Sequence, residues 1–225
     1  MTDIIERLRG DYFRMMILGS PGSGKTYLTV NNILPAIKKK YDEYCIFTRP
    51  YNERFYLTQF KKRMGSHIPH IFTDVPNLME IIENIKDLQK KNIKTYDKTG
   101  HPVFKSNILF LFDDVIQEKL FKDDRFLEIF INLRHLQIST ILISQVTTKQ
   151  ISTAMKANTN FFCCFRQNGF YQRRFALDLI GETLSKENPT WGQAKIKKKA
   201  LELYQDRVLK KQYGYIVIDE FANLF

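Results

Sequence analysis

The chain has 225 residues, of which 44% are hydrophobic and 13% aromatic. This composition excludes a globally disordered chain, and a length of about 1.5 average domains fits one α/β domain with insertions. Lys and Arg number 35 against 24 Asp and Glu, a formal net charge of +11. An excess of this sign and size indicates a polyanionic partner, most simply nucleic acid, although a solvated basic surface would give the same total.

In chain order, short apolar runs predict buried strands, and longer segments with apolar residues three or four positions apart predict helices. We expect a strand over 13–18, a helix over 25–39 that bends or ends near Pro35, a strand over 44–48, and helices over 53–64 and 77–91. A surface loop over 92–107 leads to a strand over 108–112, a helix over 125–136 and strands over 139–144 and 161–165. The chain then continues with an irregular segment over 181–193, a basic helix over 195–210 and a final outer strand over 213–218. Strands alternating with helices predict the α/β class, with a central, mainly parallel sheet covered on both faces. We expect a single domain over 1–225, with a core over about 11–180 and a basic helix and outer strand over about 194–225.

The cysteines and the apolar runs bear on the compartment. Cys45, Cys163 and Cys164 form no metal-ligand spacing, and an odd count with one adjacent pair predicts buried, reduced thiols. No signal-peptide core precedes Asp11, and the longest apolar runs are far shorter than the ~18 residues that span a bilayer. We therefore expect a soluble intracellular protein without a membrane partner.

The most specific pattern is a glycine-rich segment that fits G-x-x-x-x-G-K-[ST] at every fixed position. Its glycines let the backbone curl so that successive N–H groups face the β- and γ-phosphates of a nucleotide, and the helix that follows adds its positive dipole end. Lys25 is expected to reach the phosphates and Thr26 to offer its hydroxyl to Mg²⁺. The nucleotide-binding residues expected are Gly19, Ser20, Pro21, Gly22, Ser23, Gly24, Lys25, Thr26 and Tyr27.

An acidic pair follows the apolar strand over 108–112. Because ligands bind outside the carboxyl ends of parallel strands, Asp113 and Asp114 are expected beside the phosphates, on a strand neighbouring the one that leads into the glycine-rich loop. Asp113 would hold Mg²⁺, directly or through water, and Asp114 would orient and deprotonate the attacking water, which is ATPase chemistry. The alternative for this pair is a solvated acidic turn.

A second apolar strand ends in Asp219 and Glu220 and, taken alone, fits the same role. It comes so late in the chain that no strand follows it to carry a residue that senses the nucleotide. We therefore favour Asp113 and Asp114.

The strand over 139–144 ends at Gln145. An amide at that edge could contact both the γ-phosphate and the attacking water and so report the nucleotide state, whereas the simpler interpretation is a polar residue that ends a strand. Arg134 and His135 precede the same strand at the end of a helix, where cations are favoured in any case.

Together these residues resemble the HerA/FtsK superfamily of DNA-pumping ATPases. The shared order is the glycine-rich loop, the apolar strand with Asp-Asp, Arg-His before a strand, and that strand ending in Gln. The segment 155–166 also resembles the Lys-Ala-Asn segment that leads into the last core strand of FtsK-type motors. The size and the paired Asp look most like genome-packaging ATPases of large DNA viruses and virophages. The resemblance covers about 15–179 and implies a P-loop NTPase fold of the ASCE/RecA-like type.

The resemblance implies an ATP-hydrolysing, Mg²⁺-dependent translocase that packages double-stranded viral DNA without sequence specificity, acting as a ring of copies of itself. In such rings an arginine of one subunit reaches the γ-phosphate bound by the next. The candidates are Arg134, Arg166, Arg173 and Arg174, of which we rank Arg134 and Arg166 first. A capsid or portal-vertex protein is a further expected partner, in the viral factory of the host cytoplasm and in the virion. Asp114 departs from the Glu that the superfamily often has, and no DNA-orienting or nuclease domain is evident.

Three other functions fit parts of the sequence. A P-loop nucleotide or nucleoside kinase needs an Arg-rich lid, and 169–174 has arginines but precedes no clear lid. A GTPase needs an Asn-Lys-x-Asp guanine reader, which does not occur, and a non-enzymatic DNA-binding protein leaves the glycine-rich loop unexplained. For DNA-gripping loops the sequence offers either Lys119, Lys122 and Arg125 or the segment 94–105, without deciding between them.

Overall fold

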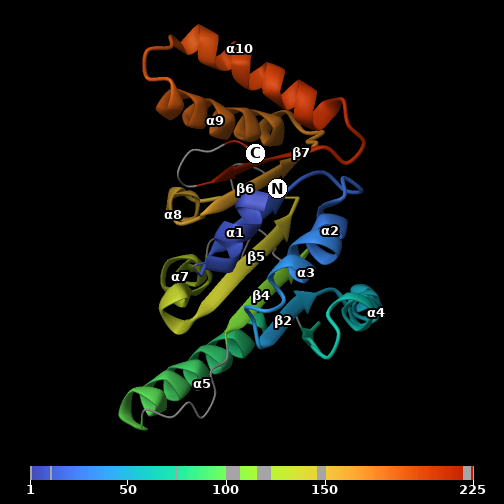
Figure 1. Ribbon diagram of the computed structural model, residues 1–225, viewed down its shortest axis with the longest axis vertical. Helices are drawn as coiled ribbons and strands as arrows, with labels where there is room; N and C mark the ends of the chain where they lie inside the picture. Colours follow the sequence, from blue (N-terminus) through green and yellow to red (C-terminus); the bar gives the residue numbers. More distant parts are fainter. Residues whose placement is uncertain are drawn as a thin grey trace.

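A seven-stranded sheet runs through the protein in the order β3-β2-β4-β5-β1-β6-β7 (Figure 1). The computed structural model describes residues 2–10, 12–73, 76–99, 107–115, 123–145, 151–219 and 224. The strands are β1 (Arg14–Leu18), β2 (Glu43–Thr48), β3 (His70–Phe72), β4 (Ile108–Asp113), β5 (Ile138–Ser144), β6 (Phe161–Phe165) and β7 (Tyr215–Asp219). Neighbouring strands are parallel, except that β7 runs antiparallel to β6. The predicted α/β class, the mainly parallel sheet and the outer position of the last strand are confirmed.

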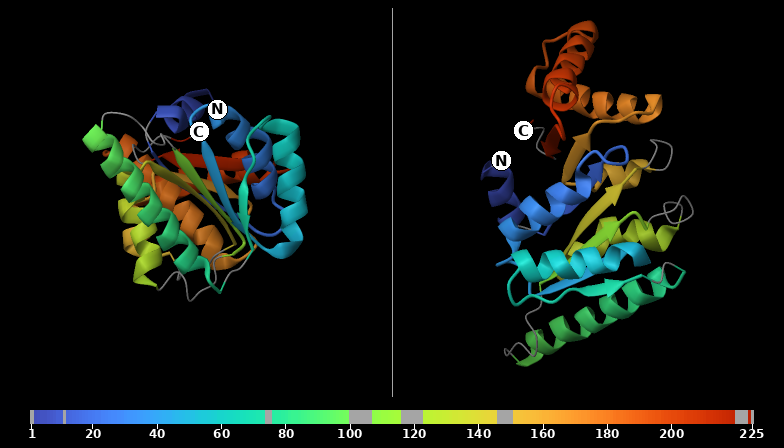
Figure 2. Two further views of the ribbon diagram at one scale, coloured as in Figure 1. Left: turned by 90° about the horizontal axis from the view of Figure 1, so that it is seen from below. Right: turned by 90° about the vertical axis from the view of Figure 1, so that its right-hand side faces the viewer.

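Helices cover both faces of the sheet (Figure 2). One face carries α1 (Thr2–Gly10), α2 (Lys25–Leu28), α3 (Leu34–Ile37) and α4 (Glu53–Arg63). The other carries α5 (Leu78–Thr99), α7 (Asp124–Asn132), α8 (Thr153–Ala157), α9 (Phe170–Glu187) and α10 (Gln193–Tyr204). Short helical turns of other types occupy Thr29–Ile33, Pro50–Asn52, Leu133–Leu136 and Gln205–Leu209. Two apolar layers therefore enclose the sheet.

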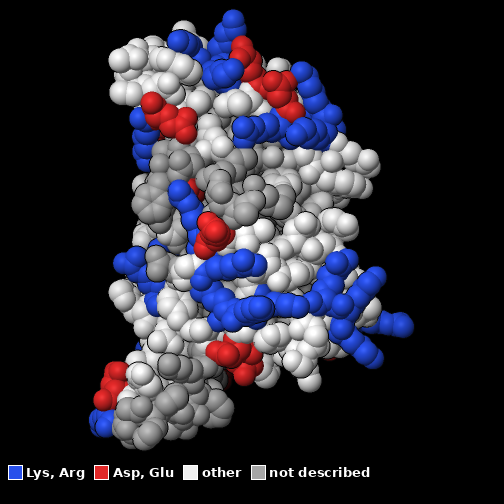
Figure 3. Space-filling model, viewed as in Figure 1, with Lys and Arg blue, Asp and Glu red and all other residues white. Residues whose placement is uncertain are grey.

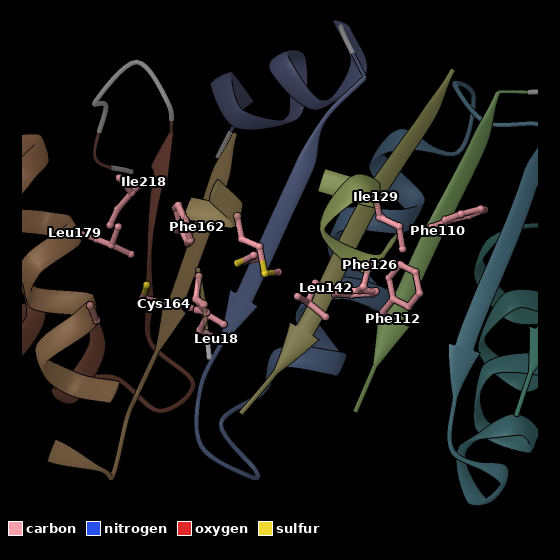
Figure 4. Packing of buried hydrophobic residues seen from close by; sticks show 14 of the residues in the cluster. Leu18, Phe110, Phe112, Phe126, Ile129, Leu142, Phe162, Cys164, Leu179 and Ile218 are labelled. Atoms are coloured by element: carbon pink, nitrogen blue, oxygen red, sulfur yellow. The ribbon is translucent and has the colours of Figure 1, made fainter. Parts of the chain in front are cut away.

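Strand β4 shows how a continuous apolar run packs on both faces of the sheet. Successive side chains point to opposite faces, so Phe110 and Phe112 pack on the α7 side while Leu109 and Leu111 pack on the α4 side. Figure 4 shows Phe126 of α7 close to Phe112, and their ring centroids are 5.7 Å apart in an edge-to-face arrangement. Because both of its faces are buried, β4 is apolar from Ile108 to Phe112 and lacks the alternation of a half-exposed strand.

Two predicted irregular segments are helical instead. The surface loop predicted over 92–107 is wrong for 92–99, because α5 continues to Thr99, and no Gly or Pro interrupts it before that point. The irregular segment predicted over 181–193 is wrong for 181–187, which belongs to α9. Gly181 is tolerated there because packing of α9 against the sheet and α10 outweighs the low helix propensity of one glycine. A Cβ atom at Gly181 would make only an ordinary contact, 3.5 Å from Cγ2 of Ile196. Residues 100–106 lie outside the described part of the chain.

The helix predicted over 25–39 is present but irregular near Pro35. Its middle, Thr29–Ile33, is a π-helical turn between α2 and α3, and Pro35 is in the first turn of α3. Because proline lacks an N–H group, a local change of hydrogen-bonding pattern beside it is expected. Sequence reasoning missed α1, β3 and α8, of which β3 has only 3 residues and α8 only 5.

Candidate functional site

The glycine-rich loop joins β1 to α2 in a conformation that depends on glycine. Gly22 has φ 69° and Gly24 has φ 100°, both in the left-handed region. A Cβ atom at Gly19 would lie 2.7 Å from Cβ of Phe165 and 2.6 Å from Oγ of Ser23. A larger residue at Gly19 would therefore clash with its neighbours, and one at Gly22 or Gly24 would strain the backbone.

The strands on both sides of β1 hold this loop in place. On the β5 side, Gly19 N donates to the carbonyl oxygen of Ser144 at 3.3 Å. On the β6 side, Ser20 N donates to the carbonyl oxygen of Arg166 at 3.0 Å, and Asn168 N donates to Ser20 Oγ at 2.8 Å. The loop is thus anchored to the carboxyl ends of two neighbouring strands.

Lys25 is buried within the loop, where its Nζ donates to the carbonyl oxygens of Gly19 at 2.8 Å and Ser20 at 3.0 Å. Burial lowers the pKa of Lys25, although the negative charges of Asp114 and Asp113 act in the opposite direction. Nearby, Oγ of Ser23 is buried without a hydrogen-bond partner among the described residues. A buried cation beside an unpaired hydroxyl is suited to a polyanion such as a triphosphate.

Thr26 and Asp113 lie close together in the structure. The sequence predicts that the acidic strand, β4, is a neighbour of β1. This prediction is wrong, because β5 lies between the two strands. The first turn of α2 bridges this gap, so that Oγ1 of Thr26 lies 3.2 Å and 3.4 Å from the two carboxylate oxygens of Asp113. A hydroxyl beside a carboxylate is a ligand pair that suits Mg²⁺.

Tyr56 of α4 is a third residue at this point, and sequence reasoning missed it. Its hydroxyl donates to Oδ2 of Asp113 at 2.6 Å, and both side chains are buried. Burial raises the pKa of Asp113, while the hydrogen bonds from Tyr56 and Thr26 lower it and so favour the ionised form. Only packing of α4 on the sheet reveals this contact, since nothing in the local sequence marks Tyr56.

Asp114 and Gln145 lie together at the carboxyl ends of β4 and β5. Nε2 of Gln145 donates to the carboxylate of Asp114 at 3.1 Å and 3.3 Å. Asp114 itself has φ 56°, a left-handed backbone conformation. Its carbonyl oxygen accepts a hydrogen bond from Nε of Arg49, at 3.1 Å. A carboxylate held by an amide is therefore positioned beside Asp113.

The competing acid, Asp219, lies at the amino ends of the parallel strands, whereas the glycine-rich loop lies at their carboxyl ends. Because β7 runs antiparallel to β6, Asp219 pairs with Phe161, the first residue of β6, and it forms an ion pair with Arg7 of α1. The carboxyl end of β7 therefore points away from the glycine-rich loop. Glu220 lies outside the described residues.

The candidate arginines occupy different places. Arg166 directly follows β6 beside the loop, whereas Arg134 is exposed in the turn before β5, at the other end of that strand from Gln145. A strand of 7 residues spans roughly 20 Å. Arg134 therefore cannot reach the loop of its own chain. Arg173 and Arg174 lie exposed on α9.

Basic side chains gather on the face that carries α3 and α4 (Figure 3). The Lys and Arg residues of this basic face are Lys38, Lys39, Lys40, Arg54, Lys61, Lys62 and Arg63. Of the loop residues that the sequence offered as DNA contacts, Arg125 pairs with Asp123 at 2.7 Å, while Lys119, Lys122 and 100–105 lie outside the described residues.

Within the described part of the chain, no helix combines the length and the apolar character needed to cross a membrane.

Comparisons with known proteins agree with this arrangement. The model of the family described as "Poxvirus A32 protein" matches residues 4–223. The DNA packaging protein OPG160 of Variola virus is 30% identical over 158 residues, which cover 68% of this chain and 53% of the relative. The chain thus spans about half the length of the curated relatives it matches.

Two solved structures share the fold. The genome packaging NTPase B204 of Sulfolobus turreted icosahedral virus 2, in complex with ATP-gammaS, gives a TM-score of 0.57 at 15% identity over 95% of both chains. The pCW3 conjugation coupling protein TcpA with ATPgS gives 0.56 at 16% identity, over 73% of this chain and 51% of that one. The P-loop NTPase fold and the resemblance to viral genome-packaging ATPases, both expected from the sequence, are confirmed.

Proposed function

The chain belongs to the Poxvirus A32 protein family, and from that premise we propose that it is an ATP-hydrolysing motor that moves double-stranded DNA into a viral capsid. The observation that carries the proposal is the meeting of Lys25, Thr26 and Asp113 at one sheet edge, with Asp114 and Gln145 beside them. The relative from Variola virus is named a DNA packaging protein, and the B204 structure is that of a genome packaging NTPase, which supports the same reading.

In this proposal the loop N–H groups and Lys25 bind the β- and γ-phosphates of ATP. Thr26 and Asp113 would hold Mg²⁺, which neutralises phosphate charge when bound. Asp114 accepts a proton from water as the water oxygen attacks the γ-phosphorus and the bond to the β-phosphate oxygen breaks. Gln145 donates to the Asp114 carboxylate and so holds it in place for this transfer. The same amide would contact the γ-phosphate.

The remaining parts of the proposal concern assembly. Copies of the chain would form a ring in which an arginine from one subunit stabilises charge at the γ-phosphate of the next. Arg134 suits action between subunits because it is exposed and remote from its own loop. Arg166 lies beside its own loop and is the second candidate. A capsid or portal-vertex protein would anchor the ring, in the viral factory or the virion.

Duplex DNA should stimulate ATP hydrolysis, and this is the test of the function. Because a motor contacts phosphates and not base edges, duplexes of different sequence should stimulate equally. With 6–10 phosphate contacts, affinity for duplex DNA should fall about 10³- to 10⁵-fold between about 50 and 200 mM salt. Steady-state hydrolysis and a salt titration of DNA binding measure both effects.

Two results would count against the motor. An affinity for DNA that hardly changes with salt would exclude phosphate-based binding. Phosphoryl transfer to an added mononucleotide, faster than transfer to water, would identify the protein as a nucleotide kinase instead.

Replacing Tyr56 with Phe should shift the acid side of the pH–rate profile to higher pH. The lost hydrogen bond favours ionised Asp113, so without it the pKa of this carboxyl rises further and the carboxylate is protonated at a higher pH. Folding stability should also fall by about 1–3 kcal/mol, because a buried acceptor loses a donor. The hydrolysis rate against pH and a denaturant titration check the two effects.

Tyr41→Phe is the matched control, since its hydroxyl also makes a buried 2.6 Å hydrogen bond, to Ser139 Oγ, away from the loop. It should lower stability without moving the pH profile. A wild-type profile in Tyr56→Phe would mean that its hydrogen bond does not favour the ionised form of Asp113 during turnover.

A further inference from the structure

A hollow of about 320 Å³ lies beside the phosphate-binding loop, on the side away from Asp113. One wall is the loop itself, residues 20–23, and the other is formed by Arg166, Asn168 and the segment 211–214. We propose that this hollow receives the base of the bound nucleotide and that Tyr213 is the aromatic surface on which the base stacks. The inference rests on the proposed ATP binding and identifies a part of the site that the loop motif does not.

The direction of the nucleotide follows from the order of the strands. Thr26 and Asp113 would hold the metal, and with it the γ-phosphate end, on the side of β1 where β5 and β4 lie. Strands β6 and β7 lie on the other side of β1. A triphosphate bound across the loop therefore directs its sugar and base towards β6 and β7, where the hollow is.

Tyr213 is held in the hollow by its close approach to the loop. A Cβ atom at Gly24 would lie only 3.1 Å from Cδ1 of Tyr213, so the absence of a side chain at Gly24 leaves room for the ring. Gly214 allows the chain to pass, because a Cβ atom there would lie 2.4 Å from the carbonyl oxygen of Arg207. Gly24 therefore has a role besides shaping the loop, because it leaves space for Tyr213, which lies far along the sequence.

Tyr213 has an unusual backbone conformation and an exposed side chain. Its φ is 58°, a left-handed value that bulky residues seldom adopt, and 59% of the residue is exposed. The ring therefore gains little from burial in the protein itself. An aromatic face kept open at the edge of a charged hollow is suited to stacking on a nucleobase, and stacking tolerates different bases because each has a π-face.

The segment 166–168, beside Tyr213 in the lining of the hollow, is held firmly enough to complete such a subsite. The backbone of residues 166–168 is tied to Ser20 by the two hydrogen bonds described above, and Gln167 N donates to the hydroxyl of Tyr204 at 3.0 Å. Lys211 and Arg166 place cations at the rim, where the sugar and α-phosphate would enter.

Nucleotide binding by Tyr213→Ala tests the inference, with inorganic tripolyphosphate as a probe that lacks a base. Stacking of one base corresponds to roughly a fivefold to hundredfold change in affinity. We expect Tyr213→Ala to weaken ATP and ADP binding by that factor while tripolyphosphate binds as in the wild type. Tyr213→Phe, which keeps the ring, should bind ATP normally, and Tyr171→Ala controls for loss of an exposed tyrosine elsewhere.

The outcomes separate the subsite from the function. Wild-type ATP affinity in Tyr213→Ala would overturn the subsite alone, and so would equal losses for ATP and tripolyphosphate, because these indicate damage to the loop. A wild-type protein that binds neither ligand would overturn the proposed function and the subsite together.

Discussion

Replacing Asp114 with Asn should abolish ATP turnover while ATP binding is retained. The substitution keeps the size of the side chain but removes the group that takes the proton from water, and general-base catalysis contributes about 10²- to 10⁴-fold. Asn should still lie beside Gln145, since the left-handed φ of 56° at this position is one that Asn tolerates. Steady-state hydrolysis and equilibrium binding of ATP, measured on the same preparation, give the two quantities.

A matched control is Asp178→Asn, an exposed acid on α9 whose carboxylate lies 3.8 Å from Arg174. It should hydrolyse ATP at the wild-type rate. Turnover by Asp114→Asn within about threefold of the wild type would mean that another group accepts the proton, because loss of the general base should lower the rate by about 10²-fold or more.

Replacing Lys25 with Ala should remove both turnover and tight ATP binding. Lys25 is 6% exposed, and its ammonium group is the cation held inside the loop. Loss of one partner of a buried charge pair costs about 2–5 kcal/mol, so affinity for ATP should fall by roughly 30- to 5,000-fold. Calorimetric titration with ATP measures the loss, and circular dichroism shows whether the variant is folded.

Lys39→Ala, an exposed lysine on the basic face, is the comparison for a change of net charge alone. It should leave ATP affinity unchanged. If Lys25→Ala bound ATP as tightly as the wild type, the loop would not be the phosphate site. Together with Asp114→Asn, this variant separates binding from chemistry, because one loses the ligand and the other only the reaction.

Local patterns in the sequence predicted much of the core. The strands β1, β4 and β6 consist largely of consecutive apolar residues because both faces of the sheet are buried, so their positions could be predicted without knowing their neighbours. Strand β5 also buries Ser139 and Thr140, but it keeps an apolar run over 141–143. Helix ends were predicted less well. The segment predicted to be irregular from Gly181 is helical as far as Glu187, because packing of α9 outweighs the low helix propensity of one glycine.

The residues that surround the loop motif were beyond local reasoning. Tyr56 and Tyr213 lie far apart in the sequence, and neither belongs to a motif. Their contacts with Asp113 and with the loop depend on which elements pack there. The expectation that the acidic strand neighbours β1 failed for the same reason, because hydrogen bonding between distant strands sets their order.

The sequence by itself determined the glycine-rich loop, the buried strands and the acids that end two of them, since each of these is a property of consecutive residues. Only the tertiary structure decided which acid meets the loop. Asp113 and Asp219 both end apolar strands, but β4 runs parallel to β1 while β7 runs antiparallel to β6, so their carboxyl ends lie at opposite edges of the sheet. Strand direction arises from long-range pairing, and no stretch of consecutive residues encodes it.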